Sequence, residues 1–212
     1  MLETSLRWSL VIPVKVLALA KSRLTGLPGA RRAELALAMA ADAVAAASAC
    51  PAVDTVIVVT DDAAAAAELS GLGALVLPDE PGDGLNPALT FGAAYADERW
   101  PSRGRAGMAA DLPALGAAEL GRALAEAAQA KQAFVADAAG TGTTLYTATP
   151  GVAFSPRFGP GSRDAHRSAG AVELLLPGID GLRRDVDTID DLYDAARIGL
   201  GPRTSVAAAP LG

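Results

Sequence analysis

Short apolar segments alternate with longer segments of helical spacing along residues 1–130. The β-branched, apolar segments predict buried strands at 9–14, 54–60, 74–77 and 106–110. Alanine-rich segments of helical spacing, one of them opened by two acidic residues, predict helices at 31–49, 61–70, 88–99 and 117–130. Strands and helices in alternation are typical of a mostly parallel sheet with helices on both faces, so we predict an α/β fold.

The second half of the chain is richer in predicted strands. Short apolar segments predict strands at 134–137, 144–147, 172–176 and 184–186, which would add antiparallel pairing to the sheet. The glycine- and arginine-rich stretch 150–168 predicts a long loop, 190–198 predicts a final helix, and the tail after about 201 is expected to fray. Because no linker or repeat divides the chain, we expect a single domain over 1–212.

Composition narrows the class of protein. Of 212 residues, 51% are hydrophobic and 20% are charged, which is enough apolar material for a sizeable core. Nucleic-acid-binding proteins usually carry a basic surface, and a chain with a net charge of −6 shows no sign of one, so we expect no nucleic-acid partner. A single cysteine, Cys50, excludes an internal disulfide and suits the cytoplasm. No segment is typical of a signal peptide or a membrane span, so we expect a cytoplasmic protein with no membrane partner.

Ligands of open α/β sheets bind outside the carboxyl ends of the strands, so the residues that follow each strand carry most information. Lys15, Lys21 and Arg23 follow the first predicted strand, and three cations there could bind a polyphosphate. A solvated loop is the alternative. The stretch has neither the P-loop pattern nor the glycine fingerprint of dinucleotide-binding folds.

Aspartates follow two of the predicted strands. Asp111 ends the strand at 106–110, where a carboxylate could bind a divalent cation or cap a turn. Asp185 and Asp187 lie two positions apart, so on a strand they would share one face and repel each other unless a cation lay between them. For Asp187 and Asp190, capping the next helix is the alternative.

Two glycine-rich stretches could approach a small anion. Residues 140–143 read Gly-Thr-Gly-Thr, and residues 158–163 form a second turn with cationic neighbours. Arg163 or Arg167 could supply balancing charge there, and we interpret His166, the one histidine, as a surface or phosphate-side residue. Ordinary connecting turns are the alternative.

Together these stretches resemble a known family, the guanylyltransferases of coenzyme F-420 biosynthesis. They are VIPVKVLALAKSRL at 11–24, TVIVVTDD at 55–62, ADLPAL at 110–115, FVADAAGTGTTL at 134–145, FGPGSRDAHRSAGA at 158–171 and DVDTIDDL at 185–192. The stretches occur in order over nearly the whole chain. One departure is Ala110, where the family's turn often has glycine before the aspartate.

The resemblance implies a Rossmann-like, glycosyltransferase-A-like nucleotidyltransferase fold with a mixed, mostly parallel sheet. It implies catalytic roles and Mg²⁺ binding for three carboxylates, those of Asp111, Asp185 and Asp187. It implies acceptor binding by Thr143, Gly159 and Ser162, and nucleotide binding by Lys15, Lys21 and Arg23. Asn86 is our candidate for reading guanine, because an amide can pair with a base edge.

The implied reaction transfers GMP from GTP to a small phosphorylated three-carbon acid and releases pyrophosphate. An ionised phosphate oxygen is the nucleophile, so the reaction requires alignment and charge neutralisation rather than a histidine base. The acceptor is open between phosphoenolpyruvate, 2-phospho-L-lactate and 3-phosphoglycerate; the loops are most similar to the actinobacterial branch, which favours phosphoenolpyruvate. A homodimer is also left open.

Two other readings compete with this one. A molybdenum-cofactor or sugar nucleotidyltransferase would share the fold and the metal-binding aspartates, but it would usually carry a Gly-Gly-rich loop after the first strand, and residues 14–24 have none. A non-catalytic nucleotide-binding module would not need the acidic positions. Metal-dependent release of pyrophosphate from GTP separates these readings.

Overall fold

The computed structural model describes residues 6–209 except 20, 22, 23, 25, 26 and 80. These residues form a sheet with the strand order β3-β2-β1-β4-β6-β5-β7. In chain order the strands are β1 (Trp8–Pro13), β2 (Val53–Val59), β3 (Leu75–Leu77), β4 (Gly104–Met108), β5 (Gln132–Ala136), β6 (Thr143–Ala148) and β7 (Val172–Glu173). Only β6 runs antiparallel to its neighbours, β4 and β5, so the predicted mixed, mostly parallel sheet is confirmed.

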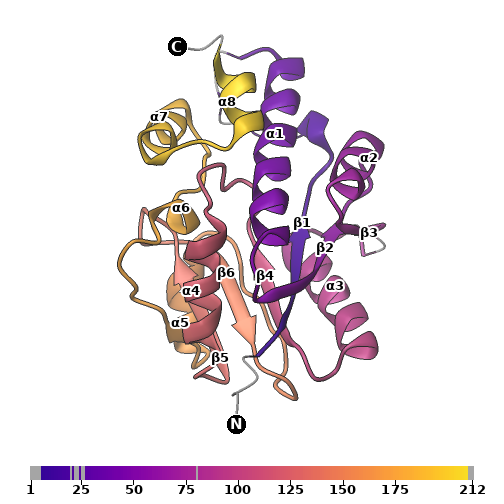
Figure 1. The fold of residues 1–212 in the computed structure, drawn as a ribbon, viewed down its shortest axis with the longest axis vertical. Coiled ribbons are helices and arrows are strands. Elements are labelled where there is room, and N and C mark those ends of the chain that lie inside the picture. Colours follow the sequence, from indigo (N-terminus) through magenta and orange to yellow (C-terminus); the bar gives the residue numbers. More distant parts are fainter. Residues whose placement is uncertain (1–5, 20, 22–23, 25–26, 80, 210–212) are drawn as a thin grey trace.

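Helices cover both faces of the sheet (Figure 1). They are α1 (Gly29–Ser48), α2 (Ala63–Gly71), α3 (Leu85–Arg99), α4 (Ala117–Ala127), α5 (Ser162–Ser168), α6 (Asp180–Arg183), α7 (Ile189–Ile198) and α8 (Pro202–Ala208), with a 3-10 turn, η1, at Leu17–Leu19. One core cluster joins α1, α2 and α4 to the sheet, and a second joins α3 to the opposite face. The described residues therefore form one α/β domain.

Strand β1 shows why the sheet is buried from both sides. All six of its residues are buried; Leu10 and Ile12 pack in the first cluster, while Val11 packs in the second. Helix α3 approaches this strand so closely that a Cβ on Gly92 would lie 2.6 Å from the Val11 side chain. An apolar strand without polar alternation thus ends up in the middle of the sheet, as expected for parallel strands covered by helices.

Asp62 caps α2, as the acidic start of the predicted helix indicated. Its carboxylate accepts the backbone N–H groups of Ala64 and Ala65, both at 3.0 Å, and that of Leu17 at 2.9 Å. These bonds hold the pKa of the Asp62 carboxyl below its usual value, chiefly through Ala65 and Leu17. The same side chain therefore starts a helix and fastens the segment that follows β1.

Three predictions for the second half of the chain are wrong. Residues 162–168 form α5 rather than part of a loop, and β7 covers only Val172–Glu173. The predicted strand at 184–186 is instead an extended connection between α6, a helix that the pattern missed, and α7. Short helices in glycine-rich sequence have too few turns to produce a readable period, because most of their stability comes from tertiary packing.

The tail does not fray over 202–208, which form α8 against α1. Asp42, buried in α1, accepts the backbone N–H groups of Arg203 at 3.2 Å and Thr204 at 2.7 Å. This carboxylate caps α8 from a position far away in the sequence, which the local pattern could not show. None of the helices in the described ranges is both long and apolar enough to cross a membrane.

Candidate active site

Carboxylates gather where β4 ends. Asp111 follows that strand, and its backbone oxygen accepts the N–H of Val186 at 3.1 Å, so the segment between α6 and α7 lies alongside. The Lys21 ammonium contacts the Asp111 carboxylate and lies 3.3 Å from an oxygen of Asp187. Residues separated by up to 166 positions in the sequence therefore meet at one point.

Lys21 occupies the space between the two carboxylates. Burial disfavours its charged form, yet Asp111 and Asp187 together raise the pKa of the ammonium above its usual value. Of the non-glycine residues that the structure describes, Lys21 alone has a positive φ, at 55°. A left-handed backbone costs free energy at a residue with a side chain, and such residues concentrate in functional sites.

Asp185 shows that negative charge is in excess. Burial, together with smaller effects of the charges of Asp111, Asp137 and Asp187, raises the pKa of its carboxyl to about 7. Of these four acidic residues, Asp111 and Asp187 pair with the Lys21 ammonium. The crowding of like charges that the Asp-x-Asp spacing predicted is present, although no strand carries it.

Asp137 is a residue that the sequence reasoning did not single out. Its carboxylate accepts the backbone N–H groups of Thr141 at 2.9 Å and Gly142 at 2.8 Å. A Cβ at Gly142 would collide with this carboxylate, so the turn requires glycine there. Its position directly after β5 was the available signal. The negative charge of Asp137 also raises the pKa of Asp185. Asp137 therefore connects the aspartates near β4 with the Gly-Thr turn at 140–143.

The carboxylate oxygens here are ligands of the type that Mg²⁺ prefers, but they do not form a complete coordination shell. Among the described residues, no three His, Cys, Asp or Glu side chains are placed to hold one metal ion. Mg²⁺ usually takes only one or two carboxylates and completes its shell with waters and substrate phosphates. Asp111 and Asp187 already share one cation, the Lys21 ammonium, so these oxygens can face a common positive charge.

The two glycine-rich loops lie side by side. The backbone N–H of Arg163 donates to the Thr141 oxygen at 3.2 Å, and its guanidinium donates to the Gly140 oxygen at 3.0 Å. Thr143 and Ser162 are both buried. The Ser162 hydroxyl, 1% exposed at the residue level, has no hydrogen-bond partner within the described structure. A buried hydroxyl left unpaired costs free energy, so Ser162 is a candidate to form a hydrogen bond with a bound ligand.

His166 is not a surface residue, which corrects our expectation. The residue is 0% exposed, and its ring lies among the rings of Phe134, Tyr146 and Phe158. Burial, with a smaller effect of the Arg157 charge, lowers its pKa to about 4. Arg163 and Arg167 both pair with Glu173, and Arg167 also lies 3.5 Å from a carboxylate oxygen of Asp164, so two carboxylates of the protein already balance the two charges.

Asn86 fastens the loop that begins at Phe158. Its amide nitrogen donates to the Phe158 oxygen at 2.9 Å, and its amide oxygen accepts the Phe158 N–H at 2.7 Å. This paired arrangement positions the neighbouring Gly159; guanine recognition by Asn86 stays a prediction. Lys15 is exposed just beyond β1, and Arg23 lies outside the described residues.

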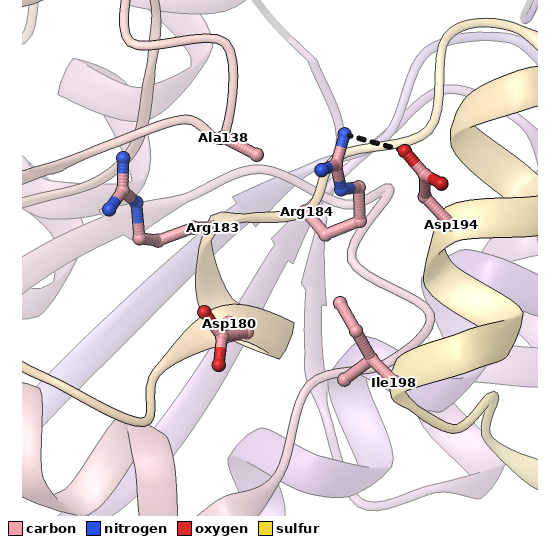
Figure 2. A pocket seen from close by; sticks show the side chains of 6 residues that line it. All are labelled: Ala138, Asp180, Arg183, Arg184, Asp194 and Ile198. Atoms are coloured by element: carbon pink, nitrogen blue, oxygen red, sulfur yellow. Dashed lines mark ion pairs between the residues drawn. The ribbon is translucent and has the colours of Figure 1, made fainter.

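A cavity of about 400 Å³ lies between α6, α7 and Ala138 (Figure 2). Its lining residues are Ala138, Asp180, Arg183, Arg184, Asp194 and Ile198. Arg184 pairs with Asp194 across it at 3.6 Å, and the Arg183 guanidinium donates to backbone oxygens of Ala136 and Asp137. Both arginines therefore support the segments that carry Asp137 and Asp185.

Comparison with known proteins shows which family the chain resembles. A family model described as "Guanylyl transferase CofC like" matches residues 8–173. The chain is 61% identical over 207 residues to a protein from Thermomonospora curvata named phosphoenolpyruvate guanylyltransferase, covering 98% of this chain and 91% of the relative.

Solved structures confirm the predicted fold. A protein from Desulfovibrio desulfuricans G20, described as a nucleotide-diphospho-sugar transferase, matches with a TM-score of 0.71 and 17% identity over 96% of this chain and 93% of its own. The crystal structure of Rv0371c from Mycobacterium tuberculosis H37Rv in complex with manganese matches with a TM-score of 0.52 and 19% identity, over 91% of this chain and 98% of its own. From the family match and the close relative together, the chain belongs to the CofC-like guanylyl transferases.

Proposed function

We propose that this protein transfers GMP from GTP to phosphoenolpyruvate and releases pyrophosphate, as a step of coenzyme F-420 biosynthesis. Membership of the guanylyl transferase family and the name of the 61% identical relative support the reaction and the acceptor. The observation that carries the proposal is the position of Asp137. Its charge acts on the carboxyl of Asp185, and its carboxylate accepts a backbone N–H of the Gly-Thr turn. Its contacts with both regions support a site in which a cation-binding half adjoins an anion-binding half.

The chemistry requires no protein base. An ionised phosphate oxygen of the acceptor attacks the α-phosphorus of GTP; a new phosphorus–oxygen bond forms, the bond to the bridging oxygen breaks, and pyrophosphate leaves with that oxygen. The protein must align two polyanions and neutralise their charge. A buried histidine that stays neutral at pH 7 is consistent with such a mechanism.

Asp111, Asp185 and Asp187 would hold Mg²⁺, which when bound neutralises charge on the reacting phosphate oxygens. The manganese complex of Rv0371c supports the use of a divalent cation in this fold. Lys15, Lys21 and Arg23 would face the GTP phosphates. Lys21 already contacts two of the carboxylates, so it stands where the nucleotide and the cation would meet.

Thr143, Gly159 and Ser162 would bind the acceptor. Ser162 offers a hydroxyl with no partner in the described structure, and Thr143 is buried at the start of β6, directly after the adjacent loop. Gly159 has φ of 132°, a conformation that residues with side chains rarely adopt, and no other atom lies within 4 Å of where a Cβ would be, so a ligand can approach its backbone. A hydroxyl pair and a bare N–H suit a small carboxylate or phosphate better than a bulky ligand.

An acceptor screen tests this function. The protein is incubated with GTP, Mg²⁺ and either phosphoenolpyruvate, 2-phospho-L-lactate, 3-phosphoglycerate or a sugar phosphate, and the product mass and pyrophosphate are measured. We expect a guanylylated phosphoenolpyruvate and dependence on the divalent cation. A guanylylated sugar would favour the sugar nucleotidyltransferase reading, and no pyrophosphate with any acceptor would favour a non-catalytic module.

Two further proposals concern the protein as a whole. We propose that the protein is located in the cytoplasm, and we propose a homodimer as the oligomeric state to be tested. Light scattering after size-exclusion chromatography measures the assembly directly.

A further inference from the structure

We propose that His166 is a positioning residue, which fixes the Thr143 hydroxyl as a hydrogen-bond donor to the anionic acceptor. The inference rests on the proposed function, because it assigns Thr143 to the acceptor site. It adds a residue that contacts no substrate and sets the direction in which a substrate-binding hydroxyl points.

The hydrogen bonds of the imidazole determine which nitrogen carries its proton. The Nε2 atom lies 2.9 Å from the backbone nitrogen of Arg157, whose N–H can only donate, so Nε2 is the acceptor. The Nδ1 atom lies 3.0 Å from the Thr143 hydroxyl oxygen, and the backbone of Ser162 also faces the ring. A neutral imidazole has one donor and one acceptor, so Nδ1 carries the proton and can only donate, to the Thr143 oxygen and to the backbone of Ser162.

The surroundings keep this ring neutral and fixed. The Tyr146 ring stacks on it at a centroid distance of 4.7 Å, the Phe134 ring lies at 5.4 Å, and the Phe158 ring meets it edge-on at 5.8 Å. No part of His166 reaches solvent. An apolar enclosure of this kind disfavours the imidazolium, so the single-donor form persists at neutral pH.

The consequence falls on the hydroxyl of Thr143. A threonine hydroxyl has one proton and can accept two hydrogen bonds. Because His166 donates to the Thr143 oxygen, the hydroxyl proton must point away from the ring, where it can be donated to another acceptor. Ser162 lies four positions before His166, one helical turn away, and its own hydroxyl is unpaired too. Two donors thus await an anion, one of them aligned before the ligand arrives.

Variants of His166 separate this role from simple packing. His166→Asn keeps an N–H close to the position of Nδ1, whereas His166→Phe keeps a ring and removes both nitrogens. Loss of an aligned donor to a charged group raises KM about tenfold to a hundredfold. We expect His166→Phe to raise the KM for phosphoenolpyruvate by up to that factor, because the Thr143 hydroxyl remains but is no longer oriented. The KM for GTP should stay unchanged, and His166→Asn should stay within about threefold of the wild type.

His166→Gln provides a second test in case the phenylalanine variant does not fold. Its amide oxygen reaches the Nε2 position and can accept the Arg157 N–H, but no donor remains at Nδ1. We expect the glutamine variant to fold and to show the same raised acceptor KM. Equal acceptor KM values for the asparagine and glutamine variants would overturn the proposal, as would a parallel rise in the KM for GTP.

A double-mutant cycle with Thr143→Val tests whether His166 acts through Thr143. If it does, removing the Nδ1 donor in the valine background changes the acceptor KM less than about twofold. Independent, multiplying effects would overturn the positioning role and leave the acceptor site intact. An unchanged acceptor KM in Thr143→Val alone would remove Thr143 from the site and defeat the proposed acceptor binding together with this inference.

Discussion

Protonation of His166 gives a stability change whose size follows from the structure. Its pKa is about 4 in the folded protein and about 6.5 when the chain is unfolded. A group whose folded pKa is depressed binds protons better in the unfolded state, so stability falls as the pH falls. The contribution is fully present above about pH 6.5 and is lost on the way to about pH 4, which amounts to about 3 kcal/mol in total.

Asp185 acts in the opposite direction over the same range. Its pKa is raised to about 7, so the folded protein binds that proton better than the unfolded chain, and acid relieves a destabilising charge. The pH profile of the wild type alone therefore mixes two opposing effects. His166→Asn isolates the first one, because the variant keeps Asp185 and loses the sole histidine of the chain.

Urea unfolding of both proteins, followed by circular dichroism between about pH 7 and about pH 4.5, supplies the free energies of unfolding. We expect the wild-type value minus the variant value to fall by about 1.4 kcal/mol for each pH unit below about 6.5. The near-complete burial of His166 supports taking the full value. A difference that does not change with pH would show that the ring titrates normally and would refute the reasoning.

Four other outcomes are expected. Asp111→Asn should keep its thermal stability and lose roughly a thousandfold or more in turnover, like omission of Mg²⁺; near-wild-type rates would remove Asp111 from the site. In the proposed site, Mg²⁺ binding to Asp185 would displace a proton below about pH 7, so the apparent Mg²⁺ affinity should weaken as the pH falls. This pH dependence should be weaker in Asp185→Asn. Ser162→Ala should raise the acceptor KM about tenfold to a hundredfold with GTP unaffected; a loss of thermal stability with unchanged kinetics would make the hydroxyl structural. Subsaturating GTP should be used in preference to ATP, and equal use would contradict the guanine assignment.

Sequence alone determined the features that depend on neighbouring residues. The apolar, β-branched segment 54–60 predicted β2, because a strand that is buried on both faces has no alternating polar positions. Asp62 predicted the start of α2, since a cap acts within a few residues. The order of short motifs indicated the family, which the comparisons confirmed, and Asp111 was recognisable from its position after a strand.

Tertiary structure decided the features that join distant segments. His166 is polar and lies in a glycine-rich stretch, yet aromatic rings from β5, from β6 and from the segment before α5 enclose it. Asp42 lies in a helix of alanines and caps α8 across the fold. Lys21 meets Asp111 and Asp187 only because β1, β4 and the segment before α7 converge. Local spacing reports periodicity and capping, whereas burial, ion pairing and tautomer depend on atoms that the fold brings together from far along the chain.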